Sequence, residues 1–480
     1  MLAAMPPTPP TTPNRGEPFI RDRGDACPGA LRLHPADDGR LARLRLPAGI
    51  LTAYQAQVLA EAARTLGDGR ISVTSRGNVE LRGLGEGCGT ELAELLSDAG
   101  LLPSAAHERI RNIVASPLAG ADGIGYGDVQ LWARELDGLL CGETWTTALS
   151  GRFLFALDDG RGDVAGLGAD VTLFSAGPAT GSPADDGTAP PADDVLVRVG
   201  RRTFRIARAD AARAALAAAD AFLVAARAAG TGAWRVKELP EGVEPDLADA
   251  LRRAGVPARP ADAVRTPGRA AAAPPHTPTG PLATQTGPVG TGRPAFAGPL
   301  PGVFGHPVSG DHAVSVALHL GRLTAAQLRA LAPEPAPAGG AVGELRLTPW
   351  RGAVVTGFAD RAAAEARLAS LAEAGLLTRA DSPWLGVGAC TGRPGCAKSL
   401  ADVRADATPG RGGGGLPVQF SGCERRCGHP HGTTGGALPR TWVDVVATAD
   451  GHYLVDGRPT PRTDLPDAVA AARGPSTPTR

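Results

Sequence analysis

Two stretches of this chain contain the same three blocks in the same order, and this repeat limits the possible folds more than any other feature. The first stretch reads ILTAYQAQVLAEAA, then GRISVTSRGNVELRGL, then LLSDAGLLPSAAHERIRNIVASPLAG. The second reads RLTAAQLRALA, then GELRLTPWRGAVVTGF, then LAEAGLLTRADSPWLGVGACTGRPGC. Apolar residues are spaced by three and four in the helical blocks and alternate in the strand blocks. Each copy therefore predicts the order helix, strand, turn, strand, helix.

A unit of this kind that occurs twice predicts an α+β fold with two ferredoxin-like half-domains related by a pseudo-twofold axis, accompanied by two α/β domains. The two copies differ where the second has GACTGRPGC and the first has VASPLAG. Ser116 falls near the position of Cys390, and no cysteine follows it in the first copy. Only one copy is thus predicted to hold a metal cluster, which leaves the other free to bind something else.

At 480 residues the chain is too long for one hydrophobic core. Two stretches rich in Ala, Pro, Thr and Gly, 175–194 and 257–301, cannot bury enough apolar surface to fold alone. The expected organisation is a disordered N-terminus over 1–20, a half-domain over 21–118, an α/β domain without a cluster over 119–256, a linker over 257–301, a second half-domain over 302–382, a cluster-binding domain over 383–470, and a tail over 471–480.

The overall charge argues against a protein that binds nucleic acids or membranes through a general electrostatic field. Lysine plus arginine and aspartate plus glutamate both number 49, so the formal net charge is zero. Recognition of an anion must therefore come from local groups of arginines. Residues 1–13 have no apolar core of a signal peptide, and the apolar stretch 214–229 is interrupted by Asp220 and Arg227. We expect a cytoplasmic protein.

The strongest chemical signal is two close pairs of cysteines, Cys390-x5-Cys396 and Cys423-x3-Cys427. Four thiolates suit an iron–sulfur cluster or a tetrahedral metal ion. Zinc sites prefer two to four residues between paired cysteines, so the wider first pair favours a [4Fe–4S] cluster over zinc or plain buried thiols. Glycines beside both pairs allow backbone N–H groups to approach the sulfurs.

The other cysteines and the histidines carry weaker signals. Cys27, Cys88 and Cys141 are scattered singly and are predicted to be ordinary core or surface residues, with Cys27 the one of most interest. His429 and His431 follow Cys427 in CGHPHG, so they either serve the cluster or form a polar loop.

Three motifs in order, TSRGNVELRG, RNIVASPLAG, and C-T-G-x3-C with C-x3-C, resemble those of the sirohaem sulfite and nitrite reductases. The resemblance covers nearly the whole chain outside the two low-complexity stretches. It implies a redox enzyme with a [4Fe–4S] cluster held by Cys390, Cys396, Cys423 and Cys427. It also implies a site for a tetrapyrrole that carries many carboxylates.

Within this superfamily, DACPGALRLHPADDGRLARLRLPAGILT and LSGRFLFALDDG are similar to the precorrin-3B synthase family of aerobic cobalamin biosynthesis. This likeness implies a monooxygenase that converts precorrin-3A, with O2 and reducing equivalents, into the C20-hydroxylated γ-lactone. A mononuclear iron is a further candidate cofactor, but the sequence shows no ligands for it. No G-x-G-x-x-G motif opens a helix after a strand, so NADH as ultimate donor implies a separate reductase.

Arginines are the expected partners of the carboxylates, because a planar guanidinium binds a carboxylate with two hydrogen bonds. Arg76 and Arg82 lie six residues apart and are predicted on one side of a strand, and Arg109 and Arg111 are predicted to share a face. The resemblance implies that Arg76 and Arg111 face the reacting side of the tetrapyrrole, and it adds Arg152 to the site. Each of them could instead be a solvated surface residue.

One departure from the reductases affects the choice of reaction. Their motif with two lysines matches Arg152 and Leu154 here, so the second cation is replaced by an apolar residue. Reduction of sulfite or nitrite consumes many protons, so the loss of a proton-donating cation argues against a sulfite or nitrite reductase. The alternatives that remain are a sirohaem-dependent assimilatory sulfite or nitrite reductase and a non-catalytic iron–sulfur or tetrapyrrole-binding protein.

Overall fold

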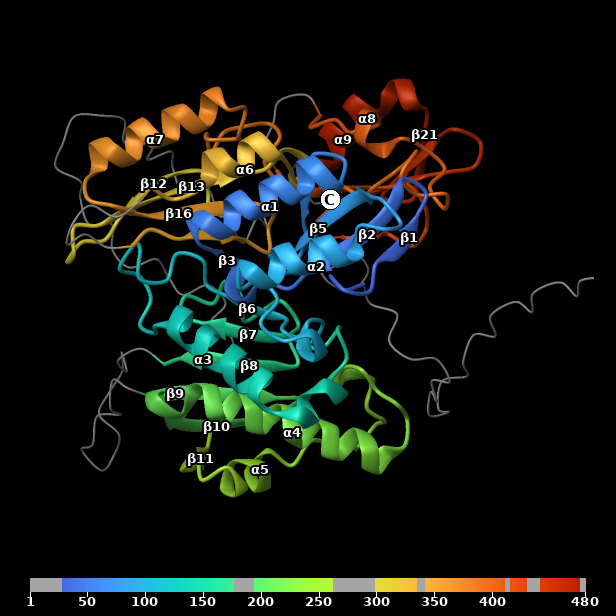
Figure 1. Ribbon diagram of the computed structural model, residues 1–480. Coiled ribbons are helices and arrows are strands. Elements are labelled where there is room, and N and C mark those ends of the chain that lie inside the picture. Colours follow the sequence, from blue (N-terminus) through green and yellow to red (C-terminus); the bar gives the residue numbers. More distant parts are fainter. Residues whose placement is uncertain are drawn as a thin grey trace, which may run out of the picture.

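The computed structural model describes residues 28–176, 194–261, 298–334, 342–410, 415–429 and 441–474. Four β-sheets organise these residues (Figure 1). Two sheets belong to the half-domains and two to the α/β domains, which confirms the predicted duplicated α+β fold. The predicted disordered N-terminus, Cys27, His431 and most of both low-complexity stretches lie outside the described residues.

The first half-domain supplies four strands to one sheet and two helices that cover it. Its elements are β1 (His34–Ala36), β2 (Gly39–Leu44), β3 (Ile50–Leu51), α1 (Ala53–Leu66), β4 (Arg70–Val73), β5 (Val79–Leu84) and α2 (Gly89–Asp98). The second half-domain repeats this order in β12 (Gly302–Gly305), β13 (His312–Ala317), β14 (Arg322–Thr324), α6 (Ala325–Leu331), β15 (Leu345–Leu347), β16 (Gly352–Phe358) and α7 (Arg361–Glu373).

The half-domains exchange their shortest strands. β14 of the second half-domain pairs with β4, and β3 of the first pairs with β15. The strand orders are therefore β1-β2-β5-β4-β14 and β12-β13-β16-β15-β3. One hydrophobic core is common to both half-domains and includes Leu51, Leu59, Leu328 and Leu345. The two copies thus form a single intertwined unit, with α1, α2, α6 and α7 packed over it (Figure 1).

Local details repeat as faithfully as the topology. Thr52 caps α1 and accepts a hydrogen bond from the Gln55 backbone N–H, while the Gln55 amide donates to the Ala99 carbonyl at 3.1 Å. Thr324 and Gln327 form the same capping box on α6, with the Gln327 amide 3.0 Å from the Ala374 carbonyl. Equal caps at equal positions indicate that the half-domains arose by duplication.

The two α/β domains also share a plan, because each begins with three neighbouring parallel strands. The first contains β6 (Ile113–Ala115), α3 (Val129–Gly142), β7 (Phe155–Asp158), β8 (Val171–Ser175), β9 (Asp194–Val199), β10 (Arg202–Ala207), α4 (Ala211–Ala229), α5 (Leu247–Arg253) and β11 (Ala258–Pro260). The second contains β17 (Val387–Ala389), α8 (Val403–Asp406), β18 (Val418–Ser421), β19 (Val443–Ala447), β20 (Tyr453–Val455), β21 (Arg458–Thr460) and α9 (Leu465–Arg473).

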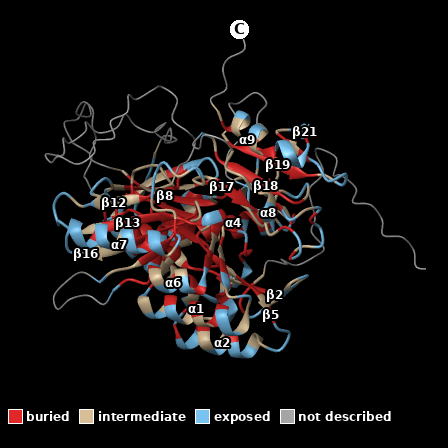
Figure 2. Ribbon diagram, turned by 90° about the horizontal axis from the view of Figure 1, so that it is seen from above, coloured by how far each residue is buried: buried red, intermediate tan, exposed pale blue. Residues whose placement is uncertain are grey.

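Burial follows this layering, with buried strands inside and exposed helix faces outside (Figure 2). The alanine-rich helix α4 is the exception among the surface-covering helices, since eleven of its residues are buried in the core of the first α/β domain. Within the described part of the chain, no helix has both the length and the apolar character needed to cross a bilayer.

Three predicted boundaries need adjustment. β6 belongs to the α/β sheet, so the first half-domain ends before the boundary expected at 118. β11 lies inside the range expected to be a linker. Ser175 and Asp194, the ends of the shorter low-complexity stretch, are in β8 and β9. Composition alone missed these strands because they are short or lie at the ends of the biased stretches.

The duplicated caps predict matched losses of stability. Thr52→Ala and Thr324→Ala should each lower the free energy of unfolding by about 1 kcal/mol, because each removes an N-cap hydrogen bond. Thermal unfolding of the two variants measures this, with Thr65→Ala, an exposed helix residue away from the cap, as the control. A clear loss in one variant and none in the other would contradict the equivalence of the two caps.

Candidate active site

A cavity of about 720 Å³ lies where both half-domains and both α/β domains meet. β2, β4 and β5 supply one wall, and the segments that follow β17 and β18 supply the opposite wall. This volume falls within the roughly 300–1,000 Å³ typical of ligand sites. Two of the paired cysteines, Cys390 and Cys427, line the cavity, so a bound ligand lies directly beside them.

The parallel pairing of β17 and β18 explains why the cysteine pairs converge. Cys390 follows β17 directly, and Cys423 follows β18 after one residue. The carboxyl ends of neighbouring parallel strands lie at the same edge of a sheet. All four cysteines are free thiols. The pattern of spacing in the sequence therefore corresponds to one group of four thiols in space.

The four thiols lie close enough together to belong to one site. Burial and then the negative charges of Cys390, Cys423 and Cys396 raise the pKa of Cys427, so the four sulfurs are close enough to repel as thiolates. The Gly422 N–H also donates to the Cys390 sulfur at 3.2 Å, and hydrogen bonds of this kind tune a metal centre.

The first half-domain holds the cysteine loop in place. Arg82 donates two hydrogen bonds to the Asp38 carboxylate, at 2.9 and 2.8 Å, and one to the Gly395 carbonyl at 2.7 Å. Asp37 accepts a further hydrogen bond from the Ala397 N–H. Gly395 lies between Cys390 and Cys396, so the turn between β1 and β2 and the guanidinium of Arg82 fix the first cysteine pair.

The cavity is strongly cationic. Two carboxylates, Glu80 and Glu238, line it together with ten basic side chains. The basic residues are Arg43, Arg45, Arg76, Arg152, Arg235, Lys237, Arg351, Arg404, Arg425 and Arg426. Carboxylates pair with Arg43, Arg235 and Arg426. The remaining excess of positive charge suits a ligand with several negative groups. Local arginines thus provide the positive charge for anion binding, although the net charge of the chain is zero.

Only two of the five arginines predicted for this site line the cavity. Arg76 does so from the turn after β4, and Arg152 does so while its guanidinium stacks over Trp234, 4.8 Å from the ring centre. Arg82 belongs to the clamp on the cysteine loop. Arg111 is buried and binds Asp137 through two hydrogen bonds of 2.6 Å. Arg109 is not among the cavity residues.

These placements correct the predictions for Arg82, Arg109 and Arg111, and the reason is the same for each. A two-residue alternation holds only along an uninterrupted strand. The turn at 74–78 separates Arg76 from Arg82, and the segment before β6 is a short 3-10 turn followed by irregular backbone. From that segment Asn112, not Arg111, reaches the cavity.

The cavity residues that were not predicted from the sequence come mostly from segments without a known motif. Arg43 and Arg45 alternate along LARLRLP at the end of β2, and this alternation predicts that both side chains lie on the same face. Arg235 and Lys237 come from a 3-10 turn, η5 (Val236–Glu238), far along the chain. Lys237 bears on the choice of reaction, since it brings a cation to the cavity although Leu154 is buried in a small apolar core.

The repeat itself contained one further signal. By strand register, Arg351 occupies the position of Gly77, and both have positive φ, 58° and 69°. A non-glycine residue rarely adopts this conformation, and here it directs a guanidinium to the second cysteine pair. Arg351 donates to the Gly428 carbonyl and to the Gln419 side chain at 3.3 Å.

The duplicated position in the other copy is closed. Ser116 accepts a hydrogen bond from the Asp159 N–H at 3.2 Å, as the equivalent Cys390 does from Gly422. Arg346 lies nearby and donates hydrogen bonds to the Pro117 and Ala119 carbonyls. Trp350, at the position of Arg76, packs against a small apolar core. The cysteines, the cavity and its arginines were therefore kept in one copy only.

Three carboxylates lie where the first copy would otherwise place cysteines: Asp158, Asp159 and Asp163. Their oxygens are already engaged. Asp158 accepts four backbone N–H groups, Asp159 pairs with Arg161, and Asp163 accepts from Ser116 at 2.6 Å. These bonds fold the loop after β7, so a structural role accounts for the group, and we assign no iron to it.

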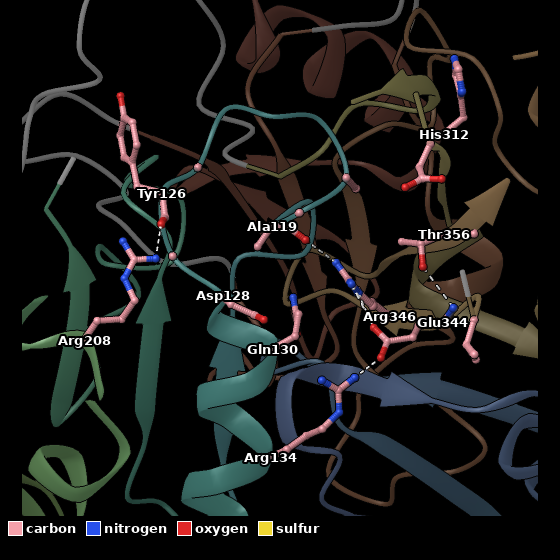
Figure 3. A pocket seen from close by; sticks show the side chains of 17 residues that line it. Ala119, Tyr126, Asp128, Gln130, Arg134, Arg208, His312, Glu344, Arg346 and Thr356 are labelled. Atoms are coloured by element: carbon pink, nitrogen blue, oxygen red, sulfur yellow. Dashed lines mark hydrogen bonds and ion pairs between the residues drawn. The ribbon is translucent and has the colours of Figure 1, made fainter. Parts of the chain in front are cut away.

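A second cavity of about 570 Å³ lies at the start of α3 and has a different character (Figure 3). Its arginines, Arg134, Arg208 and Arg346, are balanced by Asp128, Asp311 and Glu344. Glu344 binds both Arg134 and Arg346, and Arg208 donates to the Tyr126 carbonyl (Figure 3). With balanced charge and no cysteine in its wall, this cavity does not suit a polyanion beside a redox centre.

His429 is the histidine that lies at the larger cavity, where it stacks on Trp442 with ring centres 5.5 Å apart. His431 and Cys27 lie outside the described residues. Cys88 and Cys141 are half-buried and do not line the cavity.

Known proteins support this reading of the fold. The nitrite/sulfite reductase ferredoxin-like half domain matches residues 34–97. A ferredoxin–nitrite reductase of Synechococcus elongatus is 35% identical over 134 residues, 26% of this chain and 26% of the relative. A precorrin-3B synthase of Sinorhizobium sp is 33% identical over 165 residues, 34% of this chain and 35% of the relative. The matches thus span only about a quarter to a third of these relatives.

The structural comparison extends over most of the chain. The Mycobacterium tuberculosis NirA protein has a similar fold, with a TM-score of 0.61 and 16% sequence identity over 89% of this chain and 79% of that one. At this identity the likeness establishes the fold. It confirms the duplicated arrangement of half-domains and α/β domains.

The buried carboxyl of Asp163 predicts a pH dependence of stability. Burial and the neighbouring Asp158 raise its pKa from 3.8 to about 7. The folded state therefore binds more protons than the unfolded state between these values, and stability falls as the pH rises from about 4 to about 7. Asp163→Asn should remove this loss, which reaches a few kcal/mol since one pKa unit corresponds to about 1.4 kcal/mol.

Thermal unfolding of the two proteins at pH 5 and pH 8 measures the effect. Asp381→Asn, which changes an exposed carboxyl, is the control and should leave the pH dependence nearly unchanged. An equal pH dependence in wild type and Asp163→Asn would show that Asp163 does not titrate in this range.

Proposed function

We propose that this chain, a member of the nitrite/sulfite reductase superfamily, acts as a precorrin-3B synthase. The reaction is the oxygen-dependent hydroxylation of precorrin-3A at C20, with closure of the ring-A acetate onto C1 as a γ-lactone. The observation that carries the proposal is the cationic cavity of about 720 Å³ with Cys390 and Cys427 in its wall. The similarity to a precorrin-3B synthase supports the choice of reaction.

The reaction balances with two electrons and two protons from outside. Precorrin-3A, O2, two electrons and two protons give precorrin-3B and water, so one oxygen atom enters the macrocycle and the other leaves as water. A [4Fe–4S] cluster held by Cys390, Cys396, Cys423 and Cys427 would supply the electrons singly. NADH is the proposed ultimate donor, through a separate reductase.

The chain's own residues bind and orient the substrate. Precorrin-3A carries a fringe of carboxylates, and the basic residues surround the cavity from every wall: Arg43, Arg45, Arg76, Arg152, Lys237, Arg351, Arg404 and Arg425. Bidentate arginine contacts fix direction as well as position. The set of arginines would therefore determine which meso carbon faces the reacting oxygen, and we assign no residue as general acid or base.

A sirohaem-dependent sulfite or nitrite reductase is the second candidate, and one observation favours it. Lys237 and Arg235 bring cations to the cavity, so protons could be delivered there even though Leu154 is apolar. The same cavity suits sirohaem, because sirohaem is also a polycarboxylate tetrapyrrole.

Turnover distinguishes the two reactions. Anaerobically purified protein with a reconstituted cluster is given precorrin-3A, a reductant and isotopically heavy O2, and the products are analysed by mass spectrometry. The proposal predicts incorporation of one heavy oxygen atom into the macrocycle. Sharp sirohaem absorption bands together with sulfite or nitrite reduction, and no oxygen incorporation, would contradict it.

The binding role of the cavity can be tested without turnover. Arg152→Ala should weaken binding of uroporphyrin, a stable octacarboxylate, roughly tenfold or more, because a hydrogen-bonded charge pair contributes about 1.5–3 kcal/mol. Fluorescence titration measures the affinity. Arg201→Ala, which removes an exposed arginine outside the cavity, is the control. Equal affinities in both variants would exclude Arg152 from the site.

A further inference from the structure

Arg404 lies at the boundary between the cavity and the cysteine loop, and the hydrogen bonds it makes within the described residues go to carbonyls. It lies on α8, eight residues after Cys396, and lines the cavity together with Cys390. Its hydrogen bonds go to the carbonyls of Leu320 and Ala389, both at 3.3 Å. Its Nε is buried and has no hydrogen-bond partner among the described residues.

Two buried arginines of this protein pair with carboxylates. Arg82 has Asp38, and Arg111 has Asp137, each through paired hydrogen bonds. A cation that lines a cavity at low exposure is stabilised by an anion placed beside it. Burial, with the nearby charges of Arg322 and Arg351, lowers the pKa of Arg404 to about 9, and the Cys390 thiolate acts in the opposite direction.

Two anions can interact with Arg404. The first is the negative charge at Cys390, which includes any cluster that Cys390 holds. The second is a carboxylate of the ligand in the cavity. A positive charge near a redox centre stabilises the reduced state, which carries one more negative charge, and neutralising that positive charge removes the stabilisation.

We propose that Arg404 couples the two sites, so that a tetrapyrrole carboxylate bound to Arg404 lowers the reduction potential of the cluster. This inference rests on the proposed binding of a carboxylate-rich tetrapyrrole. By linkage, reduction of the cluster weakens ligand binding by the same factor. An effect of about tenfold in affinity corresponds to about 59 mV for a one-electron couple. The cluster then gives up its electron more readily when substrate is in place.

Redox titration followed by electron paramagnetic resonance tests this coupling. The cluster-loaded protein is titrated with and without saturating uroporphyrin, and uroporphyrin affinity is measured separately in the oxidised and reduced states. Wild type should show a lower potential with ligand and about tenfold weaker binding when reduced. Arg404→Gln should lower the potential of the free protein and lose most of the ligand-induced shift.

Two further variants separate coupling from binding and from folding. Arg152 lies on the wall formed by the first α/β domain. Arg152→Gln should therefore weaken uroporphyrin binding equally in both redox states and leave the shift in reduction potential at saturation unchanged. Arg404→Lys keeps the positive charge and should retain most of the shift. It also provides the test if Arg404→Gln fails to hold a cluster.

The outcomes distinguish this inference from the function on which it rests. The coupling would be overturned if uroporphyrin bound and shifted the reduction potential equally in wild type and Arg404→Gln. Equal uroporphyrin affinity in the oxidised and reduced states of wild type would also overturn it. Either result would leave tetrapyrrole binding intact. No uroporphyrin binding by wild type would contradict the proposed function, and the coupling with it.

Discussion

The exchange of β3 and β14 between the half-domains is the constraint on which the rest of the structure depends. Each sheet is completed by a strand of two or three residues from the other copy, and one core is buried between them. Neither half-domain can therefore shift relative to the other without exposing that core. The α/β domains are attached to this unit, so the cavity walls and the cysteine loop are held in one fixed relation. The contacts of Arg82 with Asp38 and Gly395 extend the same rigidity to the first cysteine pair.

Pseudo-symmetry produces two equivalent positions, and a few substitutions decide that only one is a site. Cys390 becomes Ser116, and the glycine beside it, Gly422, becomes Asp159. Arg76 becomes Trp350, and Ser72 becomes Arg346, whose guanidinium donates to the Pro117 carbonyl. The open copy accumulates buried positive charge, which is costly without anions. The closed copy gains apolar packing and paired charges instead. Stability and function have thus been divided between two halves of one duplicated fold.

The sequence predicted those features that depend on local patterns. Repeated helix and strand blocks gave the duplicated fold, and the spacing of four cysteines gave their convergence, because both follow from elements that are regular over several residues. Strand exchange could not be predicted, since β3 and β14 are too short to carry a pattern. The predicted shared faces of Arg76 with Arg82 and of Arg109 with Arg111 were wrong, because alternation was extended across a turn and across irregular backbone. The placement of Arg111 at the reacting side came from the family resemblance, and here Arg111 binds Asp137 instead. Lys237 and Arg404 reach the cavity only through tertiary folding, and no motif in the sequence marks them.

We propose that Cys390, Cys396, Cys423 and Cys427 hold an iron–sulfur cluster in the wall of a cationic cavity. The test is metal and acid-labile sulfide analysis of anaerobically purified protein, compared with Cys427→Ser. Wild type should contain about four iron and four sulfide per chain, as in a [4Fe–4S] cluster, and the variant should lose them. One zinc per chain without sulfide in wild type would contradict it.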